Sequence, residues 1–112
     1  GYRVGQGDTI ILESCEYCNS FLNFFPTVAV ILNVEEDHLD FFKDLADIEH
    51  SFHAFADLVP QRGYIISNAD DAGARDSVKG LQHPVFTFAV QDRRTAWRTT
   101  CPSSTAARCL TW

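Results

Sequence analysis

The sequence predicts an α/β protein with a mainly parallel sheet flanked by helices, and two observations carry this prediction. Four short apolar runs are nearly continuous and rich in β-branched and aromatic residues, which is typical of strands buried on both faces of a sheet. Helical patterns separate the later runs, so strands and helices alternate along the chain. The four runs lie at residues 9–12 (TIIL), 28–32 (VAVIL), 64–67 (YIIS) and 85–89 (VFTFA).

A long amphipathic helix is predicted between the second and third runs. Its apolar residues recur every three or four positions and therefore share one helix face. They are Phe41, Leu45, Ile48, Phe52, Phe55 and Val59. Asp44 is the expected N-cap, with Asp47 three residues further on. Pro60 and Gly63 should end the helix and turn the chain into the next strand.

A second, shorter helix is predicted over residues 72–78, with Asp70 or Asp71 as its N-cap. Helices that connect parallel strands form right-handed crossovers. We expect these crossovers to place helices on both faces of the sheet, with the apolar stripe of the long helix packed against the strands.

The composition of the 112 residues fits about one folded domain, since 46% are apolar and nine are phenylalanine. No apolar stretch approaches the roughly 20 residues of a membrane helix and no signal peptide opens the chain, so we expect a soluble, cytoplasmic protein. Residues 1–90 carry a net charge of −9, which disfavours binding to nucleic acid. The sequence does not indicate an oligomeric state.

The last 22 residues differ from the rest of the chain. Residues 91–112 carry a net charge of +3 and show little apolar periodicity. We therefore expect an atypical tail that packs poorly, as a flexible terminus, an irregular strand and loop, or non-native sequence.

Polar side chains follow the ends of the first three predicted strands. Glu13 follows the first, Asn33 and the sequence E-E-D-H ending at His38 follow the second, and Asn68 to Asp71 follow the third. Ligands of parallel sheets gather at this edge, where Glu13 and His38 could share a divalent cation. The alternative is that the acids form a solvated turn before the next helix, because acidic residues favour helix starts.

The four cysteines do not match a zinc or redox motif. Cys15 and Cys18 form one C-x-x-C, whereas Cys101 and Cys109 are too widely spaced for the second pair of a zinc ribbon. A thioredoxin-type motif often has glycine or proline between its cysteines, and here they are Glu16 and Tyr17. We therefore expect reduced thiols that hold no zinc.

Several short motifs carry a resemblance to a known family. In chain order they are E-S-C-E-Y, S-F-L, a proline-led strand that ends in asparagine, D-H-L-D, a helix with spaced phenylalanines, and N-A-D-D. In this order and spacing they resemble the central, ATP-binding domain of the Mur ligases over residues 1–89. The resemblance implies part of a P-loop-type α/β domain.

The resemblance also implies a chemistry. Mur ligases use ATP to convert a carboxylate into an acyl phosphate, which an amine then attacks, and magnesium neutralises the phosphates. By motif, Glu13 and His38 correspond to magnesium ligands, with Asn33 and Asp37 as flanking residues. Asn33, Asn68 and Asp71 are weaker candidates for binding the cofactor ATP. The motifs are most similar to those of the member that joins L-alanine to UDP-N-acetylmuramate in peptidoglycan synthesis.

The chain departs from the family pattern at both ends. It begins after the family's phosphate loop, so residues 1–90 are interpreted as a partial central domain, and the isolated chain is expected to be inactive. Two alternatives stay open. The chain could belong to a sibling ligase that recycles murein peptides, or it could be a non-catalytic metal-binding or interaction module.

Overall fold

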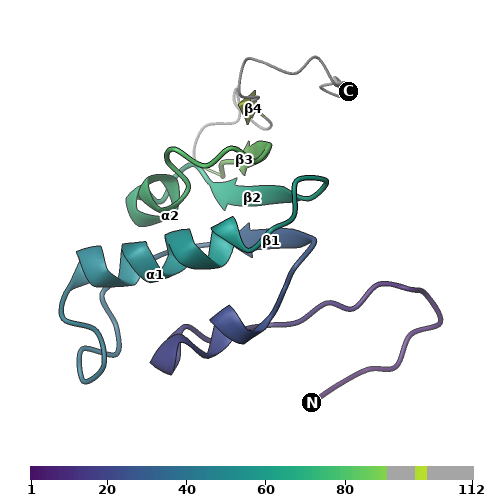
Figure 1. Ribbon diagram of the computed structural model, residues 1–112, viewed down its shortest axis with the longest axis horizontal. Coiled ribbons are helices and arrows are strands. Elements are labelled where there is room, and N and C mark those ends of the chain that lie inside the picture. The colour runs from purple at the N-terminus through teal and green to yellow at the C-terminus, as the bar shows by residue number, and fades with distance from the viewer. Residues whose placement is uncertain (91–97, 101–112) are drawn as a thin grey trace.

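The computed structural model describes residues 1–90 and 98–100, which build a four-stranded sheet with two helices packed against it (Figure 1). The strands follow one another in the order β1-β2-β3-β4. β1 pairs with β2 and β2 with β3 in parallel, and β4 pairs with β3 in the antiparallel direction. Their bounds are β1 (Val28–Ile31), β2 (Tyr64–Asn68), β3 (Val85–Phe88) and β4 (Arg98–Thr100).

Three of the four apolar runs therefore form the parallel strands that the sequence predicts. The strand prediction for residues 9–12 is wrong. These residues have no regular secondary structure, and Ile10 and Ile11 are 82% and 92% exposed. A β-prone run becomes a strand only where a neighbouring backbone edge pairs with it, and Figure 1 shows the N-terminal segment extending away from the sheet.

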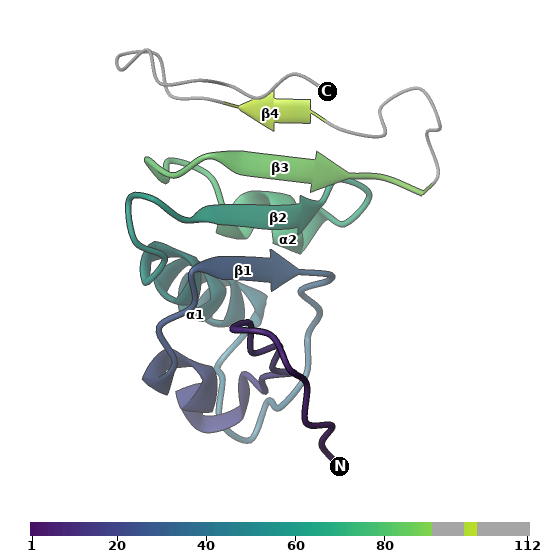
Figure 2. The same cartoon turned by 90° about the vertical axis from the view of Figure 1, so that its right-hand side faces the viewer.

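The helices α1 (Leu45–Asp57) and α2 (Ala72–Ser77) lie on the same face of the sheet, whereas helices on both faces were expected (Figure 2). The strand order explains the difference. Each parallel strand is added on the same side of the one before it, so right-handed crossovers bring both connecting helices to one face. From β1 to β3 the order in which strands are added never reverses, so neither connecting helix moves to the opposite face.

Burial alternates along β1 and β2, so these two strands are buried on one face only. Ala29, Ile31 and Ile65 point towards the helices and are at most 1% exposed, whereas Val30 and Tyr64 are 50% and 39% exposed. The expectation of strands buried on both faces is therefore wrong for these residues. The nearly continuous apolar runs conceal the alternation, because apolar side chains also occupy the open face.

The apolar stripe of α1 packs against the sheet, as predicted, with a shift at its start. Ile48 and Val59 belong to the buried core, and Phe52 and Phe55 pack against it. Phe42, at 3% exposure, fills the position expected for Phe41. Because residues 41 and 42 precede the helix, its 3.6-residue period does not decide which of the two points inwards.

A 3₁₀ segment, η1 (Tyr17–Asn23), packs against α1. Its Phe21 is 2% exposed and stacks on Phe55, with ring centroids 4.8 Å apart and an interplanar angle of 11°. Phe21 also meets Phe52 edge to face at 5.1 Å. These ring contacts join the segment before β1 to the helix after it.

Both predicted helix starts are confirmed by side-chain caps. The Asp44 side chain accepts a hydrogen bond from the Asp47 backbone N–H at 2.9 Å. The Asp71 side chain accepts one from the Ala74 N–H at 2.7 Å, so Asp71 rather than Asp70 caps α2. Each cap satisfies one of the backbone donors that lack partners in the first helical turn.

The predicted tail lies mostly outside the described residues. Three of its residues, Arg98–Thr100, form β4 on the outer side of β3. Within residues 1–90 and 98–100, no helix is long and apolar enough to cross a membrane.

Candidate functional site

The predicted site lies where β1 and β2 end, because both strands point to the same edge of the sheet (Figure 2). Asn33 lies two residues after the end of β1 and is exposed, and Asn68 is the last residue of β2. The fold therefore places these two candidate residues at neighbouring strand ends, as the sequence predicts for parallel strands.

Asn68 ties the end of β2 to the end of β1. Its side-chain Nδ2 donates a hydrogen bond to the Leu32 carbonyl oxygen at 3.0 Å. Its Oδ1 accepts from the Asp70 backbone N–H, also at 3.0 Å. Both ends of the amide therefore hold the backbone of this edge in place.

Asp71 makes a similar connection between α2 and the segment after β1. Its Oδ1 accepts hydrogen bonds from the Ala74 N–H and, at 3.1 Å, from the Val34 N–H. Val34 is 37 residues away in the chain and only 4% exposed. One carboxylate oxygen thus caps a helix and satisfies a nearly buried backbone donor on another segment.

Replacing Asp71 by alanine should lower the free energy of unfolding by about 2 kcal/mol, because a lost N-cap costs about 0.5–2 kcal/mol and an unsatisfied buried donor about 1–3 kcal/mol. Asp71→Asn is the matched control, since its amide oxygen still accepts both hydrogen bonds. Urea unfolding followed by circular dichroism measures both. Equal losses in the two variants would contradict the capping role.

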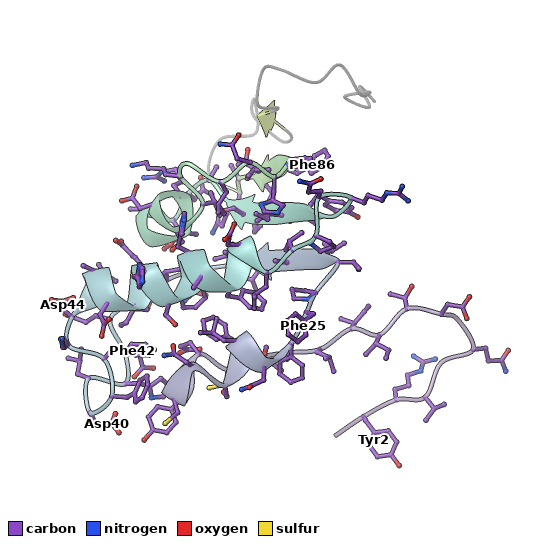
Figure 3. The ribbon with its side chains drawn as sticks, viewed as in Figure 1. Tyr2, Phe25, Asp40, Phe42, Asp44 and Phe86 are labelled. Atoms are coloured by element: carbon purple, nitrogen blue, oxygen red, sulfur yellow. The ribbon has the colours of Figure 1, made fainter. Side chains whose placement is uncertain are left out.

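The acidic sequence after β1 forms a tight turn around His38. His38 has a left-handed backbone with φ at 54°. Its carbonyl oxygen accepts from the N–H groups of Phe41 and Phe42 at 2.8 and 3.0 Å. Figure 3 shows Asp40 and Phe42 on this loop, beside the start of α1. Because Phe42 is buried, the turn is anchored to the core.

The carboxylate next to His38 belongs to Glu16, three residues after the predicted Glu13. His38 Nε2 lies 3.5 Å from Glu16 Oε1 and 3.9 Å from Asp37 Oδ2. Glu13 lies on the segment before η1 and is exposed. The sequence E-S-C-E contains both glutamates. Because both follow the same apolar run, the sequence pattern does not indicate which of them lies beside His38.

Tyr17 holds η1 against the same loop. Its hydroxyl donates a hydrogen bond to Asp40 Oδ2 at 2.9 Å, and its ring lies 4.8 Å from that of His38. The hydrogen bond to the Asp40 carboxylate raises the pKa of Tyr17 above its usual value of 10.0. The contact is therefore present below pH 10 and is lost when the pH rises through the raised pKa.

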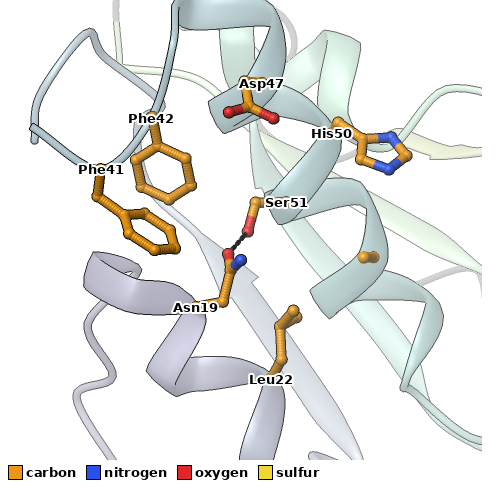
Figure 4. A pocket seen from close by; sticks show the side chains of 8 residues that line it. Asn19, Leu22, Phe41, Phe42, Asp47, His50 and Ser51 are labelled. Carbon is orange, nitrogen blue, oxygen red and sulfur yellow. Dashed lines mark hydrogen bonds between the residues drawn. The ribbon is translucent and has the colours of Figure 1, made fainter. Parts of the chain in front are cut away.

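A pocket of about 290 Å³ opens between η1, the loop and α1 (Figure 4). Asn19, Phe42 and His50 are among the residues that line it, and Ser51 donates a hydrogen bond to Asn19 across it. Its volume is at the lower limit for small-molecule sites, about 300–1,000 Å³. The predicted residues Glu13, His38 and Asp71 do not line it, so this pocket is separate from the predicted site.

Of the side chains near the predicted site, only some are suitable magnesium ligands. It prefers oxygen ligands in octahedral geometry and usually keeps several waters. The exposed Glu13 carboxylate can supply such an oxygen. His38, however, has as near neighbours the Glu16 carboxylate and the Cys15 thiol, and the three ligand atoms lie within 4.8 Å of one another. A thiol is a poor magnesium ligand.

The parallel strands, the helices on one face of the sheet and the polar side chains at the strand ends define an α/β domain. Residues 5–108 match the Mur ligase middle domain family. The chain therefore belongs to the Mur ligase family, as the motif resemblance implied.

Two curated relatives with the same name show this similarity. The chain is 44% identical over 91 residues to the UDP-N-acetylmuramate–L-alanine ligase of Caldanaerobacter subterraneus subsp. tengcongensis. This match covers 81% of this chain and 20% of the Caldanaerobacter ligase. It is 46% identical over 90 residues to the ligase of the same name from Clostridium novyi. This match covers 80% of this chain and 20% of the Clostridium ligase. The chain thus spans about a fifth of the length of these relatives.

Proposed function

We propose that this chain supplies part of the ATP-binding domain of an ATP-dependent ligase that joins L-alanine to UDP-N-acetylmuramate in peptidoglycan synthesis. The observation that carries this proposal is the similarity, at 40–46% identity, to curated ligases with that name. The matching family is that of the middle domain. The proposal keeps the cytoplasmic location expected from the sequence.

In this reaction, ATP phosphorylates the carboxylate of one substrate, and the amine of the other displaces phosphate to form the amide. Magnesium would supply charge neutralisation on the transferred phosphoryl group. Glu13 and His38 are the residues of this chain proposed to hold it. Asn33 and Asp37 flank them on the segment after β1, and Asn68 holds the end of β2 against it.

Asn68 and Asp71 are proposed to act at this site by positioning its backbone. Their side chains hold Leu32 and Val34, the residues on either side of Asn33. Because transfer reactions depend on the orientation of bound groups, a loosened strand end would reduce turnover without removing a ligand.

A chimera tests the proposal. Residues 5–90 of this chain replace the matching segment of the Caldanaerobacter ligase, and ADP formation is measured with UDP-N-acetylmuramate and L-alanine. We expect turnover that requires both substrates. Glu13→Ala and His38→Ala should each lower it by about 100-fold, since metal-ion stabilisation is worth several kcal/mol and each 1.36 kcal/mol is tenfold.

Glu35→Ala is the matched control, because Glu35 is an exposed acid on the same loop and should leave turnover unchanged. A folded chimera without turnover, beside an active Caldanaerobacter ligase, would refute the proposal. Turnover with a murein peptide but not with L-alanine would instead assign the chain to a recycling ligase. The chain by itself should show no turnover, because its sequence contains no G-x-x-x-x-G-K-[ST] phosphate loop.

A further inference from the structure

Two segments that are far apart in the sequence bring a thiol, a carboxylate and an imidazole together. Cys15 and Glu16 lie directly before η1, and His38 lies on the loop after β1. Their ligand atoms all lie within 4.8 Å of one another. Glu16 and His38 have side chains that are 26% and 33% exposed, so an ion from solvent can reach them.

We propose that Cys15, Glu16 and His38 form a binding site for a zinc-like divalent cation. The three donors are the Cys15 thiolate sulfur, a Glu16 carboxylate oxygen and an imidazole nitrogen of His38, and water completes a tetrahedral shell. Zinc takes all three donor types, and sites with three protein ligands and one water are common. Binding releases the thiol proton of Cys15 to solvent, because the thiolate is the ligand.

The distances suit this class of ion. Zinc binds sulfur at about 2.3 Å and nitrogen or oxygen at about 2.0–2.2 Å, so tetrahedral ligand atoms lie about 3.5 Å apart. The Glu16 and His38 atoms already have this separation, at 3.5 Å. The Cys15 sulfur lies within 4.8 Å of both atoms, so this exposed side chain is the one that has to move closer when an ion binds.

Buried aromatic residues fix both segments. On one side, the Cys15 carbonyl oxygen accepts from the Phe21 N–H at 3.1 Å and from the Ser20 hydroxyl at 2.8 Å, and Phe21 is buried. On the other side, the His38 carbonyl oxygen accepts from the N–H of the buried Phe42. The ligands are thus held near one another before any ion binds, which reduces the entropic cost of binding.

This site uses one cysteine of the C-x-x-C and leaves out the other. Cys18 has a left-handed backbone with φ at 53° and does not belong to the group. The expectation that the cysteines hold no zinc considered only cysteine spacing, whereas the histidine ligand comes from 23 residues further along the chain. The site also shares His38 with the proposed magnesium site, so the two ions would compete for it.

The test is a cobalt titration of the reduced, metal-free 112-residue chain carrying Cys101→Ser and Cys109→Ser. Cobalt(II) reports a thiolate ligand through a sulfur-to-metal charge-transfer band, and zinc should then displace it at one ion per chain. We expect Cys15→Ser to abolish this band. Cys15→Ser and His38→Asn should each weaken cobalt binding, measured by dialysis and elemental analysis, by about tenfold or more, since loss of even an outer partner of a metal ligand costs about 10–100-fold.

Cys18→Ser is the matched control and should leave the band and the affinity unchanged. Asparagine is chosen at position 38 because it tolerates the left-handed backbone, and circular dichroism checks that each variant folds. A band that survives Cys15→Ser, or that Cys18→Ser removes equally, would overturn the proposal, as would displacement of cobalt by equimolar magnesium.

Discussion

Replacing Ile65 by alanine should lower the free energy of unfolding by about 2–5 kcal/mol, the largest loss that we expect from a single substitution in this chain. Ile65 lies in the central part of the sheet and is 0% exposed. Its register partners are Ala29 on β1 and Val85 on β3, and both are buried. The missing methyl groups would leave a cavity that the neighbouring strands, tied by backbone hydrogen bonds, cannot close.

Val30→Ala is the matched control for this substitution. Val30 lies on β1 but is 50% exposed, so its truncation should cost no more than about 1 kcal/mol, the span of measured strand propensities. Urea unfolding measures both variants, with an unchanged slope showing that the denatured state is comparable. Similar losses at the two positions would show that the helix-covered face is not the core of the sheet.

Replacing Gly73 by alanine should destabilise the chain by about 2 kcal/mol, although alanine is the better helix former by about 1 kcal/mol. A Cβ at this position would lie 2.5 Å from the Val34 carbonyl oxygen and 2.8 Å from the Val34 Cβ. Neither atom can rotate away, because one belongs to the backbone and the other is fixed to it. The start of α2 and the segment after β1 would have to separate.

Gly80→Asn separates this clash from the general effect of losing a glycine. Gly80 has φ at 79°, which asparagine tolerates, and nothing lies within 4 Å of an added Cβ. We expect a change within about 0.5 kcal/mol there, as for other surface substitutions. A stabilised Gly73→Ala variant in the same unfolding assay would show that helix propensity outweighs the close approach.

Asp71 and Gly73 both allow the start of α2 to lie close to Val34. Asp71 draws the Val34 backbone towards α2 by a hydrogen bond, and the missing side chain of Gly73 makes room for it. The N-A-D-D motif and the following A-G therefore have a structural role at the edge where the ligand site is proposed. Substitutions here would change both stability and the position of Asn33.

Local signals in the sequence were sufficient for most of the secondary structure. Asp44 was identifiable as a cap, and Asp71 as one of two candidates beside Asp70, because an aspartate before a helical pattern accepts a hydrogen bond from a backbone N–H three residues on. Three apolar runs became parallel strands for a similar reason, since β-branched residues bounded by turns favour that conformation wherever a partner strand is present. The motif resemblance then supplied the family, which spacing alone does not.

Tertiary structure decided what depends on distant partners. The run at residues 9–12 has the local pattern of a strand, yet it is exposed because no neighbouring edge pairs with it. Which face of β1 and β2 is buried depends on the side to which both crossovers return. Glu16 rather than Glu13 lies beside His38 because η1 turns back towards the loop after β1. A sequence states which donors a chain contains, but the distance between two of them is set by every backbone dihedral and packing contact in between.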